Sequence, residues 1–250
     1  MAGKIKHIFV ELKGHLPFTA FGAVLGIVFM LLFRKISDSG AHTLFAIFHP
    51  VHVILSAIVT TSMFRLHSFK KHFITIIIIG YVGSVGIATL SDIVMPHIGS
   101  AIFGLDIPTH EELHLEQAES DDPAVQNHEH EEGIHFGFIE EWYLVNPAAL
   151  LGILIGYFLP HTKFPHSAHI LISTWASAAY LLMRIYTEIN LVATMEIFII
   201  LFLSVWIPCV FSDIIFPLIF VKPDVELAGP CPVHRFHSHP HRHTRDEAYK

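Results

Sequence analysis

The chain has 250 residues, of which 52% are hydrophobic and only 15% are charged, and its formal net charge is -7. Soluble domains carry about 25% charged residues, so this composition excludes an ordinary soluble domain and predicts an integral membrane protein. The negative charge and the lack of a basic stripe argue against nucleic acid as a partner and leave the lipid bilayer as the expected one.

In chain order, six apolar segments are each close to the roughly 20 residues that cross a bilayer as a helix. They cover residues 16–33, 44–64, 73–95, 143–159, 167–187 and 191–221. The expected fold is therefore an all-α integral membrane protein with six transmembrane helices. The fourth segment is short, and we expect Trp142, Tyr143 and Leu144 to anchor it at the membrane interface.

The positions of the basic residues predict the orientation, because Lys and Arg are retained on the cytoplasmic side during insertion. With six spans, 12 of the 15 basic residues lie in the amino-terminal segment, the second and fourth loops or the carboxyl-terminal tail. We therefore expect a multi-pass protein of the cell membrane with both termini in the cytoplasm. No cleavable signal is expected, because the first apolar run is long enough to span and ends at Arg34 and Lys35.

Three motifs occur once in each half of the chain, in the same order. They are Pro17, Gly22 and Gly26 with Pro147, Gly152 and Gly156; His49, His52, Ser56 and Thr60 with His166, His169, Ser173 and Ser177; and Ser91, Asp92 and Ile93 with Ser212, Asp213 and Ile214. Because each half has three spans, the second half must be inverted relative to the first, as in many secondary transporters. We expect the glycine pairs to let helices pack closely.

The duplication divides the chain into four parts. They are a first three-helix repeat at residues 1–105, an acidic external loop at residues 106–141, a second repeat at residues 142–222 and a cytoplasmic tail at residues 223–250. The acidic loop has no Lys or Arg but many Asp, Glu and His residues, so we expect it to be disordered and to hold cations weakly. The tail has five histidines from His234 to His243 and is expected to bind metal weakly. Cys209, in the sixth span, and Cys231, in the tail, indicate no external disulfide.

Each half also carries two histidines and an aspartate that the repeat places at one depth. The two sets are His49, His52 and Asp92, expected near the outer side, and His166, His169 and Asp213, expected near the cytoplasmic face. Imidazole and carboxylate are common ligands of divalent transition metals, which favours zinc and leaves iron, manganese, cobalt and nickel open. Residues expected to support these ligands or to line the ion path are Ser56, Ser91, Ser173, Ser212 and Glu196.

These features favour a permease that carries a divalent transition-metal cation by alternating access between the two His-His-Asp sets. One alternative is an intramembrane zinc hydrolase that acts on a lipid amide or ester, although an enzyme needs one asymmetric site. Another is a haem-binding electron carrier, in which His52 could pair with His97 and His15 with His169. A homo-oligomer is compatible with each hypothesis. No nucleotide-binding motif supports coupling to ATP.

Overall fold

The structure is a computed structural model that describes residues 2–67, 73–105, 141–160, 163–185, 189–211 and 216. The predictions for the acidic loop, for Ser212 and Asp213 and for the tail fall on residues outside these ranges. His166 is placed only by its backbone, so nothing is said of its side chain.

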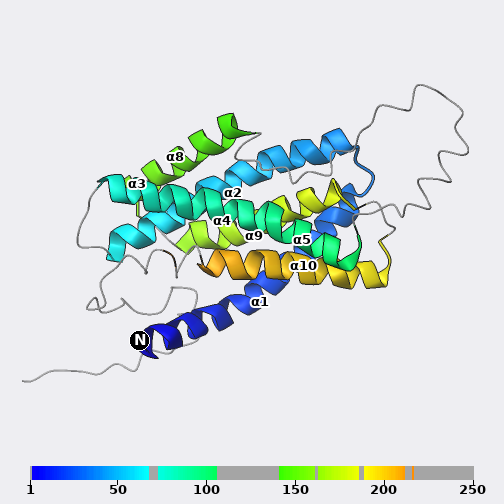
Figure 1. Cartoon of the computed structure of the whole chain (residues 1–250), viewed down its shortest axis with the longest axis horizontal. Helices are drawn as coiled ribbons and strands as arrows, with labels where there is room; N and C mark the ends of the chain where they lie inside the picture. Colours follow the sequence, from blue (N-terminus) through cyan, green and yellow to red (C-terminus); the bar gives the residue numbers. More distant parts are fainter. Residues whose placement is uncertain are drawn as a thin grey trace, which may run out of the picture.

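The described part of the chain is helical and contains no β-strand, which confirms the all-α prediction there. Its helices are α1 (Ala2–Phe33), α2 (Asp38–His67), α3 (Phe73–Tyr81), α4 (Ile87–Thr89), α5 (Met95–Phe103), α8 (Trp142–Phe158), α9 (Lys163–Leu182) and α10 (Leu191–Val210). Two π-helical segments, η1 (Val82–Gly86) and η2 (Leu90–Val94), join α3, α4 and α5 into one long helix (Figure 1). Each of the six predicted spans therefore begins on a helix.

Four of these helical segments are long and apolar enough to cross a membrane: Lys13–Phe33, Asp38–Leu66, Phe73–Phe103 and Leu191–Cys209. The helix Trp142–Phe158 is apolar but shorter. The structure is therefore consistent with a membrane protein, while the six-span topology stays a prediction.

Helices α2 and α9 pack against each other at the centre of the bundle and run antiparallel (Figure 1). Near the start of α2, the ring of Phe45 lies 5.9 Å from that of Tyr180, which is near the end of α9. Further along α2, the ring of His52 lies 4.6 Å from that of His169, which is nearer the start of α9. The residue numbers therefore rise along one helix as they fall along the other. This antiparallel packing brings His52 and His169 face to face.

The glycines of α1 allow a close approach to α9. A Cβ atom on Gly26 would lie 2.8 Å from Cγ2 of Thr174 and 2.9 Å from Cδ1 of Leu201. A Cβ atom on Gly22 would lie 3.2 Å from Oγ1 of Thr174. Since real Cβ atoms rarely come so close to their neighbours, larger residues would push the helices apart.

The glycines of α8 play the same part against α2. A Cβ atom on Gly152 would collide with the carbonyl oxygen of Ile54 and would lie 2.6 Å from Cβ of Ala57. A Cβ atom on Gly156 would lie 2.8 Å from the carbonyl oxygen of Ile58. The prediction that both glycine pairs serve helix packing is thus confirmed.

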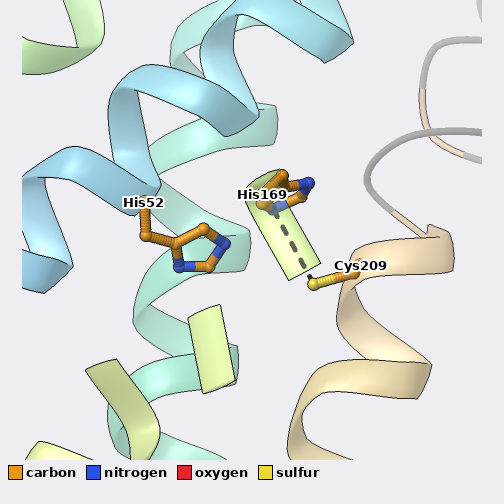
Figure 2. Close-up of side chains that lie close together, drawn as sticks. All are labelled: His52, His169 and Cys209. Carbon is orange, nitrogen blue, oxygen red and sulfur yellow. Dashed lines mark hydrogen bonds between the residues drawn. The ribbon is translucent and has the colours of Figure 1, made fainter. Parts of the chain in front are cut away.

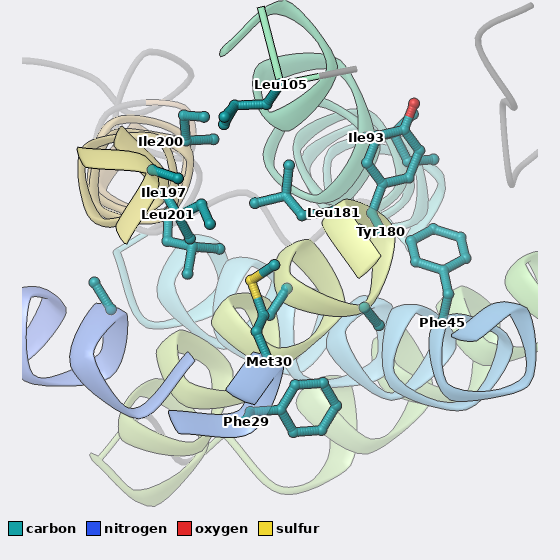
Figure 3. Close-up of a cluster of buried hydrophobic side chains, with 14 residues drawn as sticks. Phe29, Met30, Phe45, Ile93, Leu105, Tyr180, Leu181, Ile197, Ile200 and Leu201 are labelled. Carbon is teal, nitrogen blue, oxygen red and sulfur yellow. The ribbon is translucent and has the colours of Figure 1, made fainter. Parts of the chain in front are cut away.

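An apolar cluster fills the space between α1, α2, η2, α9 and α10 (Figure 3). Its largest members include Phe29, Met30, Phe45, Ile93, Tyr180, Leu181, Ile197, Ile200 and Leu201. Lipid chains are as apolar as these side chains, so close packing rather than escape from water has to hold such helices together. The cluster ends where polar side chains of α2, η2 and α9 begin, and these form the candidate site.

Candidate metal centre

Asp92 lies on η2 and is the hub of a buried polar network. Its Oδ2 atom lies 2.9 Å from Nδ1 of His49 and 2.7 Å from Nδ1 of His52. All three side chains are fully buried. The spacing of three residues puts both imidazoles on one face of α2, as the sequence predicted. π-Helical turns like η2 are frequent at functional sites.

The second carboxylate oxygen of Asp92 is also engaged. Ser173, on α9, donates a hydrogen bond from Oγ to Oδ1 of Asp92 over 3.2 Å, and its Oγ lies 2.7 Å from Oγ of Ser91. Ser177 donates to the carbonyl oxygen of Ser91 over 3.2 Å. The predicted supporting residues Ser91 and Ser173 therefore lie next to Asp92 and link η2 to α9.

This network assigns the protons of the two imidazoles. An ionised carboxylate can only accept hydrogen bonds, so Nδ1 of His49 and Nδ1 of His52 each donate to Asp92. In a neutral imidazole the other nitrogen, Nε2, then carries a lone pair. Nε2 is buried in both histidines and has no hydrogen-bond partner among the described residues. A carboxylate bonded to one imidazole nitrogen while the other is left for a metal is the usual arrangement around metal-binding histidines.

Three potential metal ligands from three helices meet beside Asp92. His52 on α2, His169 on α9 and Cys209 on α10 each offer one ligand atom, and these atoms lie within 4.8 Å of one another (Figure 2). Sγ of Cys209 lies 3.7 Å from Nε2 of His169. All three side chains are buried.

The spacing of these atoms is close to that of a metal site. Tetrahedral zinc, with the usual bond lengths, separates a nitrogen from a sulfur ligand by about 3.5 Å and two nitrogen ligands by about 3.3 Å. The Cys209 to His169 distance of 3.7 Å already fits, and the widest separation of 4.8 Å needs a contraction. Rotation of side chains can supply a movement of roughly 1 Å.

Aromatic rings cover the centre on the side where α2 begins. Phe45, one turn before His49, stacks on it with ring centroids 5.0 Å apart and planes inclined by 10°. Tyr180 packs edge-on against Phe45 and its hydroxyl lies 3.3 Å from Nδ1 of His97. Phe45 and Tyr180 are buried, so they form an aromatic cap over His49.

The structure brings three of the predicted ligands into contact. His49, His52 and Asp92 are in contact, as predicted, but both oxygens of Asp92 are occupied by hydrogen bonds. Ser56 is buried on α2, and Glu196 is partly buried on α10. Whether any of these residues binds metal stays a prediction.

The predicted separation of the two histidine sets across the membrane is wrong for His52 and His169, whose rings are 4.6 Å apart. The physical reason is the length of α2. The apolar segment starts near Leu44, but the 30-residue helix starts at Asp38, so His52 lies at its middle. The antiparallel α9 then brings His169 to the same level.

Sequence reasoning missed Cys209, because that residue is not duplicated. Aligning the two S-D-I motifs puts Ala88 at the corresponding position of the first half. The one available signal was a cysteine three residues before the second S-D-I motif.

Comparison of the chain with protein-family models, with curated proteins and with solved structures finds no match. The chemistry of the donor set, two imidazoles and a thiol, is therefore the basis for a function.

Proposed function

We propose that the protein is a membrane permease for a divalent transition-metal cation such as zinc, which binds at one central site formed by His52, His169 and Cys209. The observation that carries this proposal is the meeting of these three donors, from three helices, in a buried place. An ionisable group inside a membrane helix is costly, so a cluster of them argues for a function. Two imidazoles and a thiolate form a donor set for which zinc has high affinity.

The arrangement of the helices supports an inverted repeat. The glycines of α1 pack on α9 and the glycines of α8 pack on α2, so the first helix of each half contacts the second helix of the other half. His52 and His169 occupy corresponding positions of the duplicated motif and face each other. Residues related by a pseudo-twofold axis can touch only at that axis. This symmetry favours a single site between the two halves. Rocking of the halves against each other would expose that site to each side of the membrane in turn.

A site between two moving halves suits a permease better than the hydrolase alternative. Hydrolysis catalysed by zinc needs a water molecule bound to the metal and a general base near that water. The carboxylate that contacts the histidines among the described residues, Asp92, has both oxygens engaged by His49, His52 and Ser173. The haem alternative would be recognised by a Soret band in the purified protein.

The proposal is tested by metal analysis of the detergent-purified protein together with metal flux into liposomes. His52→Ala and His169→Ala should each lower metal affinity and flux at least about 10-fold, because even residues behind a ligand commonly contribute that much. His42→Ala is the matched control, since His42 lies on the same helix with 64% of its side chain exposed. Unchanged metal content and flux in both centre variants would overturn the proposal.

A further inference from the structure

We propose that Cys209 binds the ion as a thiolate and makes the centre selective for thiophilic divalent cations, such as Zn²⁺, Cd²⁺ and Co²⁺, over Mn²⁺, Mg²⁺ and Ca²⁺. This inference rests on the proposed function, because it names the class of ion that the same site takes. It also narrows the prediction from the sequence, which left manganese open on the basis of aspartate ligands.

The donor set contains nitrogen and sulfur but no oxygen. Among the described residues, the cluster of ligand atoms consists of His52, His169 and Cys209. Asp92 is next to it, but its oxygens accept hydrogen bonds from His49, His52 and Ser173. Mg²⁺, Ca²⁺ and Mn²⁺ prefer carboxylate, carbonyl and water oxygens, whereas thiolate and imidazole suit zinc. The hydrogen bonds of Asp92 therefore keep its carboxylate from serving a hard cation.

The surroundings of Cys209 exclude water while leaving its sulfur accessible to an ion at the centre. The side chain packs with Ile170 and Val205 in a small apolar cluster. Its Sγ lies 3.7 Å from Nε2 of His169 and 3.8 Å from Oγ of Ser173. In Figure 2 the sulfur points from α10 toward the space between the two imidazoles. A hard ion that gave up its water to enter this place would find no carboxylate oxygen free of hydrogen bonds among the described residues of the centre.

Charge balance favours a divalent ion. When the metal–sulfur bond forms, the S–H bond of Cys209 breaks, because the thiolate is the ligand, and its proton passes to the solvent on the side to which the centre is then open. The thiolate and the Asp92 carboxylate then carry two negative charges beside two neutral imidazoles. A divalent cation makes this group neutral, and a buried neutral group avoids the large cost of an uncompensated charge. A monovalent ion would leave one negative charge buried.

The experiment uses the full-length protein with Cys231→Ser, so that Cys209 is the one remaining cysteine. Bound Co²⁺ should give a sulfur-to-cobalt charge-transfer absorption in the near ultraviolet. Zn²⁺ and Cd²⁺ should displace Co²⁺, and Mn²⁺ should not. Cys209→Ser should abolish this absorption and should reduce the preference for Zn²⁺ over Mn²⁺ at least about 10-fold.

A second variant keeps the charge but changes the donor. Cys209→Asp supplies a carboxylate oxygen and should shift binding toward Mn²⁺, with both variants checked for monodispersity in detergent. Retention of the absorption and of the Zn²⁺ preference in Cys209→Ser would overturn the inference. The proposed function would survive that result if His52→Ala still lost metal, and it would fail separately if His52→Ala bound metal like the unmodified protein.

Discussion

Asp92→Asn is the variant that best separates a positioning role from direct metal binding. The asparagine side chain has the same shape, so its carbonyl oxygen can stand where Oδ2 accepts from His49 and His52 at 2.9 and 2.7 Å. Its NH₂ group then faces Oγ of Ser173, which lies 3.2 Å from Oδ1 and can accept a hydrogen bond. The variant thus keeps its partners and loses the charge.

The expected size of the effect follows from these bonds. A hydrogen bond to a charged group contributes about 1.5 to 3 kcal/mol, and a neutral one about 1 kcal/mol. Losing the charge should therefore weaken the orientation of His52 by roughly 1 to 2 kcal/mol, which is about a 5- to 30-fold loss of metal affinity. This agrees with the 10- to 100-fold losses common for residues behind a metal ligand.

The assay is competition for Zn²⁺ between the purified protein and a chelating dye, followed by flux into liposomes. Asp38→Asn, at the start of α2, removes the same charge far from the centre and should bind normally. Asp92→Asn should keep one metal per protein at reduced affinity. Unchanged affinity and flux would refute the positioning role, and a loss of affinity as large as that of His52→Ala would show that Asp92 is itself a ligand.

Three further predictions concern packing, access and topology. Gly152→Ala should destabilise the protein by about 1 to 3 kcal/mol through overpacking, whereas Gly86→Ala, whose Cβ would meet nothing within 4 Å, should be neutral or stabilising in a thermal melt. Phe45→Ala, which opens the aromatic cap, should speed labelling of Cys209 by a small thiol reagent, whereas Phe48→Ala, which removes a ring that packs on Trp175, should not. A cysteine placed in the acidic loop should react with a membrane-impermeant reagent in intact cells, and protection of that cysteine would overturn the proposed orientation.

The grouping of Asp92 with His49 and His52 could be predicted from the sequence, although their hydrogen bonds could not. Residues three apart share a helix face, and a buried carboxylate in a membrane segment needs partners. The depth of His52 could not be predicted, because hydropathy marks the apolar part of a helix and not its polar first turns, which in α2 begin at Asp38.

The third candidate ligand, Cys209, depended on tertiary structure. Cys209 joins His169 only because α10 packs beside α9, and no periodicity within the sixth span indicates that approach. The π-helical turns of the third helix are equally invisible to hydropathy, since a hydropathy average over a window does not depend on the helix type. The repeat singled out His52 and His169, but the meeting of these two residues required the packing of α2 against α9.

The π-helical turn that carries Asp92 has a mechanical consequence. A π turn holds one residue more than an α turn, and the segment Leu90–Val94 is flanked by regular helix on both sides. If its hydrogen bonds returned to the α pattern, the surplus residue would have to move along the helix, and Asp92 would swing around the helix axis by about 100°, the angle of one residue. Because a single oxygen of Asp92 accepts from both imidazoles, this one movement would release His49 and His52 together. A change in the helix register of η2 would thus alter the orientation of both imidazoles in one step.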